Sequence, residues 1–475
     1  MVSTSADHTQ NNFIVVANRL PVDVHTEPDG NITMEPSPGG LVTALSPVLE
    51  SQQGCWVGWP GIADQPLDSF RTDEGVLLYP IELTAAEYEN FYEGFSNATL
   101  WPLYHDLIVT PTYRREWWAM YREVNLKFAE TVAHVAAEGA TVWVQDYQLQ
   151  LVPGILRQLR PDLTIGFFLH IPFPSGDLYR QLPWRDELTR GLLGADLIGF
   201  HLEQDATNFL DVAASLKDTE VEGAVSVRES SAKIICPDGH EVGVGAFPIS
   251  IDVDSVSLPS PEDVKHLRKK LGNPDTLILG VDRLDYTKGI LQRLRAYEEL
   301  LASDALPGRT VLLQVATPSR ERIDNYRETR AEVEQAVGRI NGKFAELGRP
   351  VVEYFHRSFP KNALAVMYKA ADIMLVTPLK DGMNLVAKEY VAAHPSGSGA
   401  LVLSEFAGAA VELNQAYLCN PFDLEGLKRS LRQAVMDVHH NPEEAKERML
   451  TMHNQVQEHD VNRWADAFLT ALRKA

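Results

Sequence analysis

The chain has 475 residues, of which 45% are apolar and 23% charged, and its formal net charge is −22. A chain of this length can bury large cores and is expected to form two or three domains. The acidic balance argues against a nucleic-acid-binding surface, and since no apolar run approaches about 18 residues, no membrane span is expected. Three widely spaced cysteines, Cys55, Cys236 and Cys419, are typical of a reduced, cytoplasmic protein without a zinc site.

The N-terminal half of the chain alternates short apolar runs with longer patterned segments. Residues 1–12 are polar and lack the apolar core of a signal peptide, so we expect a disordered tail. Apolar runs predict buried strands, and longer patterned segments predict helices. The predicted strands cover residues 13–17, 56–59, 141–144, 165–169 and 195–199, the predicted helices 41–49 and 112–138, and two further β-like stretches lie within 203–250.

Polar side chains follow three of these strands: Arg19, Asp146 and His170. The carboxyl ends of parallel strands meet at one edge of an open α/β sheet, and ligands bind there at a topological switch point. One such residue could occur by chance. Three of them indicate a ligand site along this edge.

A polar segment separates the first strand from the first helix. Residues 22–38 predict a loop, which Gly39 and Gly40 close. A long loop with paired glycines is typical of a mobile flap over a ligand, although an ordinary surface insertion has the same pattern.

Residues 88–101 are dense in aromatic side chains. Tyr92 and Trp101 could line a sugar site, because rings stack on C–H faces and the phenol can hydrogen-bond. The alternative is that these rings simply form part of the core.

A segment rich in Pro, Ser and Asp, residues 252–264, predicts a linker between two domains. Asp252 and Asp254 could form a metal-binding pair or a phosphatase nucleophile, but they lie in this linker and not at a strand end. The αβ alternation then restarts. Predicted strands cover 277–281, 310–315, 351–355, 373–377, 401–403 and 417–419, with helices at 321–347, from 383 onward, and towards the C-terminus. We therefore expect two doubly wound halves.

The most informative stretch covers residues 371–393. A strand, the turn at Asp381 and Gly382, and a helix beginning near Met383 would place free backbone N–H groups at a sheet edge, which suits a diphosphate. Asp381 could then accept sugar hydroxyls, and Glu389 could hold two ribose hydroxyls. A plain αβ connection with an acidic residue near the helix start would give the same pattern.

Arg283 and Lys288 follow another strand and could clamp a diphosphate, although a solvated basic loop is the alternative. No G-x-G-x-x-G follows a strand and no P-loop is present, so neither a nicotinamide cofactor nor a P-loop nucleotide is expected.

Taken together, these segments resemble the trehalose-6-phosphate synthase family, the retaining sugar-nucleotide glucosyltransferases of family 20. The resemblance runs from about Phe13 to about Ala471. It rests on VVANRLP at 15–21, Gly39-Gly40, FSNATLWP at 95–102, VQDYQL at 144–149, GFFLHIPFP at 166–174, DRLDYTKG at 282–289, GRINGK at 338–343 and TPLKDGMNLVAKEYVAA at 377–393.

The resemblance implies the GT-B fold: two doubly wound Rossmann-like domains facing each other across a cleft, with a C-terminal helix crossing back to the first domain. It places an acceptor domain at 13–250 together with a crossing helix at 456–475, and a nucleotide-sugar domain at 251–455. It also implies small-molecule substrates, no cofactor, no catalytic metal, no nucleic-acid or membrane partner, and a homo-oligomer that is a dimer or a homotetramer.

By motif, the resemblance assigns catalytic roles to His170, Asp381, Arg283 and Lys288. It assigns donor binding to Gly39, Gly40, His170, Arg283, Lys288, Phe359, Asp381, Gly382, Met383, Asn384, Leu385, Val386, Ala387, Lys388 and Glu389, the last five through their backbone. It assigns acceptor binding to Arg19, Tyr92, Trp101, Asp146 and Arg320. Of these, Arg19 and Arg320, with the Tyr92 hydroxyl, would grip a 6-phosphate.

The implied reaction transfers glucose from a nucleoside diphosphate glucose to glucose 6-phosphate with retention, and gives trehalose 6-phosphate. The identity of the base does not follow from the residues. Two alternatives stay open: a related glucosyltransferase with another phosphorylated or polyol acceptor, and a non-catalytic sugar-nucleotide-binding or regulatory subunit.

Overall fold

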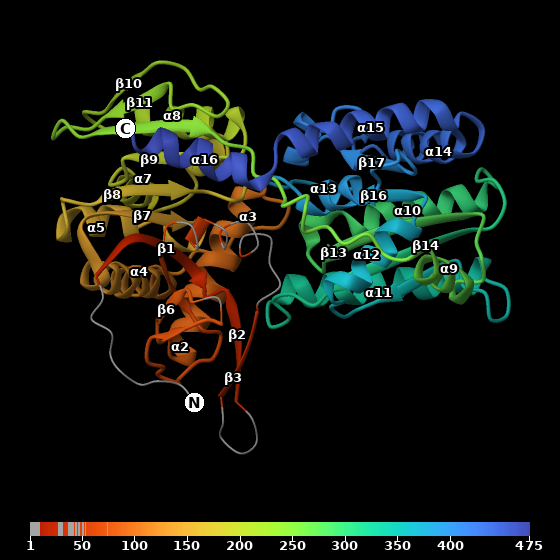
Figure 1. Ribbon diagram of the computed structural model, residues 1–475, viewed down its shortest axis with the longest axis horizontal. Helices are drawn as coiled ribbons and strands as arrows, with labels where there is room; N and C mark the ends of the chain where they lie inside the picture. The colour runs from red at the N-terminus through yellow and green to blue at the C-terminus, as the bar shows by residue number, and fades with distance from the viewer. Residues whose placement is uncertain are drawn as a thin grey trace. The chain divides into compact units, whose positions relative to one another are not determined.

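The computed structural model describes residues 10–26, 32–36, 42, 45, 48–49, 52, 54–73 and 75–475. The chain forms two compact units: unit 1 is Met1–Ile249 with Val461–Ala475, and unit 2 is Ser250–Asp460 (Figure 1). Both are α/β units built on largely parallel sheets, so the predicted fold class is confirmed. No helix in the described ranges has the length and apolar character needed to cross a bilayer.

In the described part of unit 1 the central element is a ten-stranded sheet, ordered β10-β11-β12-β9-β8-β7-β1-β4-β6-β5. Its strands are β1 (Asn11–Arg19), β4 (Cys55–Trp59), β5 (Phe70–Arg71), β6 (Leu77–Pro80), β7 (Ala136–Gln145), β8 (Thr164–Phe168), β9 (Leu197–Phe200), β10 (Glu220–Glu222), β11 (Ala232–Ile235) and β12 (Glu241–Ala246). Strands β5, β10 and β11 are antiparallel to their neighbours and the others are parallel. Chain order reverses between β1 and β7, which makes this the switch point of unit 1.

The helices of unit 1 flank this sheet. They are α2 (Ala85–Glu87), the π-helix η1 (Tyr88–Leu100), α3 (Trp101–Tyr104), α4 (Arg115–Val135), η2 (Tyr147–Leu149), α5 (Val152–Leu159), α6 (Gly176–Tyr179), α7 (Arg185–Leu192), α8 (Glu203–Ala214) and α16 (Val461–Leu472). Helix α16 is the last of the chain, yet it packs on β8 and β9 of unit 1 (Figure 1). Within the predicted helix 41–49, the residues that are described (42, 45, 48 and 49) are helical.

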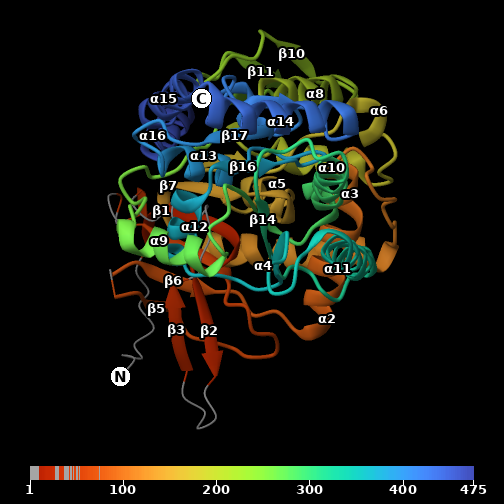
Figure 2. The ribbon, with the colours of Figure 1, turned by 90° about the vertical axis from the view of Figure 1, so that its right-hand side faces the viewer.

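Three sequence expectations for unit 1 need correction. Asn11 and Asn12 belong to β1 and not to a tail. The range 203–250, where two β-like stretches were expected, contains helix α8 followed by β10, β11 and β12. The C-terminal helix begins at Val461 and not at residue 456, because residues 456–458 complete helix α15. The predicted loop 22–38 contains two paired strands, β2 (Val22–Thr26) and β3 (Ile32–Pro36), which form a ribbon apart from the main sheet (Figure 2). Alternation of apolar and polar residues in VDVHT and ITMEP explains this ribbon.

Unit 2, which is described without gaps, contains a six-stranded parallel sheet in the order β15-β14-β13-β16-β17-β18. Its strands are β13 (Thr276–Arg283), β14 (Thr310–Thr317), β15 (Val352–Phe355), β16 (Ile373–Val376), β17 (Ala400–Ser404) and β18 (Tyr417–Cys419). Numbered within the unit, this order is 3-2-1-4-5-6, that of a dinucleotide-binding fold. Its switch point therefore lies between β13 and β16.

The helices of unit 2 cover the two faces of this sheet and share a core with it. They are α9 (Pro261–Lys270), η3 (Tyr286–Lys288), α10 (Ile290–Ala302), α11 (Asp324–Phe344), α12 (Lys361–Ala370), α13 (Leu385–Ala392), η4 (Gly408–Val411), α14 (Leu424–His440) and α15 (Pro442–Glu458). The segments that follow β13 and β16 carry the charged residues which the sequence singled out.

Candidate active site

The switch point of unit 2 joins two of the predicted site residues directly. The Nζ atom of Lys288, at the end of η3, lies 2.6 Å from Oδ2 of Asp381 in the turn after β16. The Asn384 side-chain amide donates a hydrogen bond of 3.1 Å to the same oxygen. Both charged side chains are mostly buried, with 10% and 14% of their surface exposed. The carboxylate of Asp381 is thus held by donors from both sides of the switch point.

A buried carboxylate, Asp285, gathers cations at the same edge. It accepts hydrogen bonds from the Thr287 backbone N–H and from the Tyr326 hydroxyl, and it lies 3.5 Å from a nitrogen of Arg320. Burial raises the pKa of Asp285, but Arg320, Arg283 and Lys288 together outweigh it, so that the pKa lies below its ordinary value. The buried anion therefore draws a positively charged cluster together in a chain whose net charge is strongly negative.

Asp285 was not among the site residues predicted from the sequence, although it lies between the two cations of DRLDYTKG. The signal that could have found it is its position in that motif, because a buried carboxylate needs a cationic partner. Arg320, assigned to the acceptor, belongs to unit 2, whereas the other four acceptor residues belong to unit 1. Its backbone φ of 49° is in the left-handed region, and its side chain is only 4% exposed.

Helix α13 begins at Leu385, two residues later than predicted, with Asn384 as its cap. The Asn384 side-chain oxygen accepts a 3.1 Å hydrogen bond from the Ala387 N–H, which leaves other N–H groups of the first turn open to an acceptor. The Lys388 side chain turns to a buried ion pair of 2.6 Å with Glu412. Only the backbone of Lys388 is therefore left to bind a nucleotide-sugar donor, which agrees with its assignment from the sequence motif.

Glu389 lies one position further along α13. Its carboxylate accepts a 2.8 Å hydrogen bond from the Tyr368 hydroxyl, and burial raises its pKa. Phe359, the predicted base-site residue, lies beside Phe355 with ring centroids 5.5 Å apart, and the Arg357 guanidinium covers both rings. The two rings are nearly perpendicular, at 86°, and both are partly exposed, so this segment presents aromatic and guanidinium groups to which a planar base could pack.

In unit 1 Asp146, which follows β7 at the switch point, contacts His170, which follows the neighbouring strand β8. Asp146 follows β7 with a φ of 73°, and its carboxylate accepts a 3.1 Å hydrogen bond from the His170 backbone N–H. The His170 ring Nε2 lies 2.8 Å from the side-chain oxygen of Gln145. Burial, with the neighbouring His201 ring, lowers the pKa of His170 well below its ordinary value. The imidazole is therefore neutral at pH 7.

Arg19 and Tyr92 are connected by a ladder of rings. The Arg19 guanidinium lies over Trp59 at 5.1 Å, Trp59 contacts Tyr88 at 4.7 Å, and Tyr88 stacks on Tyr92 at 5.2 Å. Arg19 also pairs with Asp23 at 2.7 Å. Gly61 lies beside it with a φ of 94°, a backbone conformation that favours glycine. The two predicted phosphate-binding groups of unit 1 therefore lie at the ends of one stacked series.

Asn97 is a second residue that sequence reasoning missed. Its side-chain amide donates to the Tyr92 carbonyl at 2.8 Å, and its oxygen accepts from the Tyr147 hydroxyl at 2.7 Å. Tyr147 follows Asp146 and contacts the Trp101 ring at 5.6 Å. Buried Asn97 thus links the backbone of Tyr92 to Tyr147, the residue next to Asp146. The motif FSNATLWP was the signal in the sequence that could have pointed to it.

Two further predictions concern the glycine pair Gly39 and Gly40 and the aspartate pair Asp252 and Asp254. Gly39 and Gly40 lie outside the described residues. Asp252 caps its own turn by accepting hydrogen bonds from the backbone of Asp254 and Ser255, which gives the metal-binding or nucleophile alternatives no support. The ranges described contain no group of three or more His, Cys, Asp or Glu side chains placed to hold a metal.

Comparison with known proteins gives consistent matches over nearly the whole chain. The model of glycosyltransferase family 20 matches residues 11–474. Trehalose-6-phosphate synthase of Mycobacterium avium (strain 104) is 54% identical, over 100% of this chain and 97% of its own length.

Two solved structures have the same fold. One is an α,α-trehalose-phosphate synthase (UDP-forming) from Burkholderia xenovorans in complex with glucose-6-phosphate, with a TM-score of 0.86, 33% identity and coverage of 97% of this chain and 100% of that chain. The other is described as trehalose-6-phosphate from E. coli bound with UDP-2-fluoro glucose, with a TM-score of 0.86, 33% identity and coverage of 98% and 99%.

Proposed function

The chain belongs to glycosyltransferase family 20, with the GT-B fold, and on this premise we propose that it is a trehalose-6-phosphate synthase. It would transfer glucose from a nucleoside diphosphate glucose to glucose 6-phosphate with retention of configuration, giving trehalose 6-phosphate and a nucleoside diphosphate. The observation that carries this proposal is the cluster of Arg283, Lys288 and Arg320 around buried Asp285 at the switch point of unit 2. Both substrates are anionic phosphates, which an acidic protein binds only where it concentrates cations.

The donor roles fall on unit 2. Arg283 and Lys288 bind the diphosphate and neutralise the leaving group, the task that a metal ion performs in other enzymes. On these grounds we propose a reaction that needs neither metal nor cofactor. Glu389 accepts the ribose hydroxyls. Asp381, fixed by Lys288 and Asn384, accepts hydroxyls of the transferred glucose.

The acceptor roles fall mainly on unit 1. Arg19 and the Tyr92 hydroxyl bind the 6-phosphate, and the ladder of Trp59 and Tyr88 holds them at a fixed spacing. Arg320 of unit 2 adds a third phosphate ligand. Trp101 and Asp146 bind the sugar ring and its hydroxyls, and neutral His170 contacts the transferred glucose. The neighbour that was solved with glucose-6-phosphate supports this class of acceptor.

The proposed chemistry is a front-face substitution. The anomeric hydroxyl oxygen of glucose 6-phosphate bonds to the anomeric carbon of the donor on the face from which the diphosphate oxygen departs. That departing oxygen takes the hydroxyl proton, so the configuration is retained and no covalent glucosyl-enzyme forms. Asp146 is already engaged by the His170 N–H, which favours a binding role for it over that of a nucleophile. Trapping of a glucosyl adduct on Asp146 by mass spectrometry would overturn this step.

The decisive experiment gives the purified protein glucose 6-phosphate with ADP-, GDP- or UDP-glucose in parallel, and detects both products. We expect trehalose 6-phosphate with α,α linkage by NMR, and the ratio of kcat/KM values identifies the preferred base. Glucose in place of glucose 6-phosphate is the acceptor control. No product from any donor, with donor binding intact, would contradict the proposal and favour another acceptor or a regulatory role. The homo-oligomeric state and the cytoplasmic location stay predictions.

A further inference from the structure

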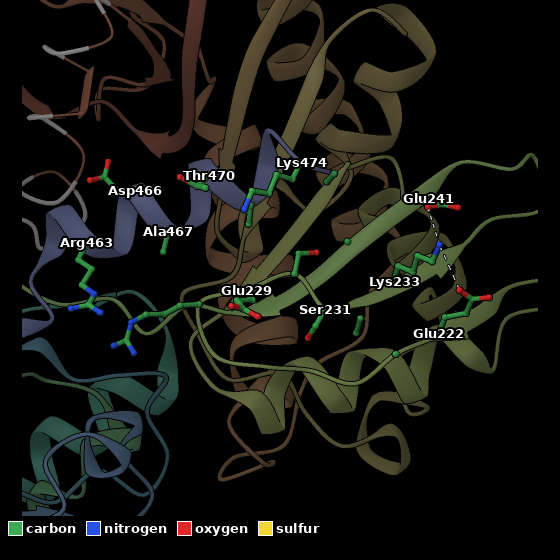
Figure 3. A pocket seen from close by; sticks show the side chains of 17 residues that line it. Glu222, Glu229, Ser231, Lys233, Glu241, Arg463, Asp466, Ala467, Thr470 and Lys474 are labelled. Carbon is green, nitrogen blue, oxygen red and sulfur yellow. Dashed lines mark hydrogen bonds and ion pairs between the residues drawn. The ribbon is translucent and has the colours of Figure 1, made fainter.

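A groove of about 1030 Å³ lies on unit 1, lined by helix α16 and by the segment that contains β10, β11 and β12 (Figure 3). We call it the α16 groove. None of the residues assigned to donor or acceptor lines it. Its volume is sufficient for a phosphorylated mono- or disaccharide.

Helix α16 presents two different faces. The face towards the groove carries Arg463, Asp466 and Thr470, and Lys474 continues it just beyond the end of the helix. These residues follow one another at spacings of three and four. Trp464 and Phe468 lie on the opposite face and are buried. Residues three or four apart share one face of a helix, so α16 lines the groove with one face and packs into the core with the other.

The buried face of α16 is fitted closely to the sheet. A Cβ at Gly166 or Gly199 would come within 2.9 Å or 2.7 Å of the Phe468 ring, so glycine is needed at both positions. Trp464 packs edge-on against Phe168 at 5.2 Å, and its ring centroid lies 6.1 Å from that of His170. A shift of α16 therefore cannot be absorbed by loose packing, and it would be felt at His170.

The groove has the chemistry of a phosphorylated polyol site. The guanidinium groups of Arg228 and Arg463 and the ammonium of Lys474 suit a phosphate, because guanidinium forks bind its oxygens in pairs. The carboxylates of Glu229 and Asp466 suit sugar hydroxyls, which donate to them.

One end of the groove holds an ion-paired lysine. Lys233 lies between Glu241 at 3.1 Å and Glu222 at 3.5 Å, away from Arg463 (Figure 3). Arg463 lies towards the other end, where a guanidinium fork suits the oxygens of a phosphate. The hydroxyl groups of Ser231 and Thr470 add neutral hydrogen-bonding partners along the wall.

We propose that the α16 groove is a second, non-catalytic site for a phosphorylated sugar, and that helix α16 transmits its occupancy to His170. The binding part stands on the groove alone. The regulatory part rests on the proposed function, because it acts through His170.

The binding test measures the stoichiometry of glucose 6-phosphate by equilibrium dialysis on the full-length protein. The wild-type protein is expected to bind two equivalents per chain, one in the acceptor site and one in the groove. Arg19→Ala is expected to lose the glucose 6-phosphate bound in the acceptor site and to keep the one bound in the groove. The double variant Arg228→Ala/Arg463→Ala is expected to lose the one bound in the groove and to keep the one bound in the acceptor site. Arg473→Ala, an exposed residue of the same C-terminal segment outside the groove lining, is the matched control and should keep both.

The outcomes separate the two proposals. One equivalent in the wild type, unchanged in the double variant, would overturn the groove site even if trehalose 6-phosphate forms. Two equivalents without any product would leave the groove site standing and overturn the proposed function. Inorganic phosphate that competes for the groove as well as glucose 6-phosphate does would show an anion site without sugar recognition, and would overturn the assigned ligand class.

The regulatory test is kinetic. Occupation of the groove is expected to change kcat/KM for the donor by about 5-fold or more, so the wild-type rate should deviate from a simple hyperbola in glucose 6-phosphate. The double variant should follow a hyperbola, and Arg473→Ala should behave as the wild type. A hyperbola in all three proteins, with two equivalents bound, would overturn the coupling through α16.

Discussion

The ammonium of Lys288 lies 2.6 Å from the carboxylate of Asp381, although 93 residues separate them in the chain. The pair forms because β13 and β16 are neighbours at the switch point of unit 2, and each residue lies just beyond one of these strands. Under the proposed function, Lys288 serves the leaving phosphate and Asp381 the transferred glucose. Each partner therefore orients the other before any substrate binds.

The first prediction concerns Lys288. Lys288→Ala should lower kcat on the order of 10²-fold or more, because the leaving diphosphate loses an ammonium partner and Asp381 loses the group that orients it. Steady-state kinetics at saturating substrates would measure this. Lys428→Ala, which removes a surface lysine paired with Glu299 and Glu425, is the matched control and should keep its kcat. An unchanged kcat in Lys288→Ala would remove this residue from the mechanism.

The second prediction concerns Arg320 and its buried partner Asp285. Arg320→Ala should raise the KM for glucose 6-phosphate strongly and leave donor binding nearly intact, because the variant loses a phosphate ligand of the acceptor alone. Equal loss of donor and acceptor binding would refute the assignment.

The same variant should also be sensitive to acid. The pKa of Asp285 is held below its ordinary value of 3.8, despite burial, and Arg320 is the strongest of the cations responsible. A carboxylate whose pKa is lowered by folding stabilises the folded protein at pH values above its ordinary pKa. This contribution is lost as the pH falls through the pKa that the group has in the folded protein. Without Arg320 the folded pKa rises, so the acid unfolding midpoint by circular dichroism should move to higher pH. Arg330→Ala, an exposed residue of α11, should leave that midpoint in place, and no shift in Arg320→Ala would contradict the prediction.

The third prediction follows from His170. Burial and His201 depress its pKa, so the folded protein binds fewer protons than the unfolded chain between the folded value and about 6.5. The free energy of unfolding should therefore rise with pH across this window. His170→Asn should weaken that rise by roughly 1 kcal/mol between pH 5.5 and 7.5, as measured by urea unfolding.

His394 provides the control for this pH dependence. Burial lowers its pKa to about 4, its Nδ1 lies 2.8 Å from the Tyr390 carbonyl, and no substrate contact is assigned to it. His394→Asn should weaken the rise of stability with pH in the same way, but only His170→Asn should also reduce the catalytic rate. If the free energy of unfolding of the wild type does not change between pH 5.5 and 7.5, the lowered pKa values of His170 and His394 are both contradicted.

The fourth prediction concerns Asn97 in the π-helix η1. Asn97→Ala leaves the Tyr92 carbonyl and the Tyr147 hydroxyl without their partner, at a cost of about 1–3 kcal/mol in the free energy of unfolding. The KM for glucose 6-phosphate should rise, since Tyr92 and Trp101 lose their common anchor. Asn90→Ala, which removes a half-buried asparagine of the same helix that donates to the Ala86 carbonyl, should change neither quantity appreciably. If both variants behave alike, Asn97 has no special role.

Much of the fold could be predicted from the sequence because its signals are local. Short apolar runs between turns place most of the strands within one or two residues, and the restart of the αβ alternation after the linker 252–264 predicts two halves. The polar residues at strand ends, Arg19, Asp146 and His170, were found without any structure. Asp146 and His170 do meet, since parallel strands bring their carboxyl ends together.

The remaining features depend on which elements become neighbours. The ribbon of β2 and β3 was mistaken for a loop because its alternating strands are short and lie among Asp, Glu and Pro. The π-helix was missed because aromatic spacing alone does not distinguish it from a packed cluster. The ion pair of Lys288 with Asp381 could not be derived from spacing, since it depends on the strand order of unit 2.

The α/β class, the order of the elements, the family and most candidate site residues could be read from the sequence. Three features emerged from the fold alone: Asp285 is the buried anion around which the cations gather, Asn97 joins the π-helix to Tyr147, and α16 separates a charged groove from the core beside His170. Periodicity and turn chemistry act over a few residues, whereas buried charges and hydrogen bonds are satisfied by partners from distant parts of the chain.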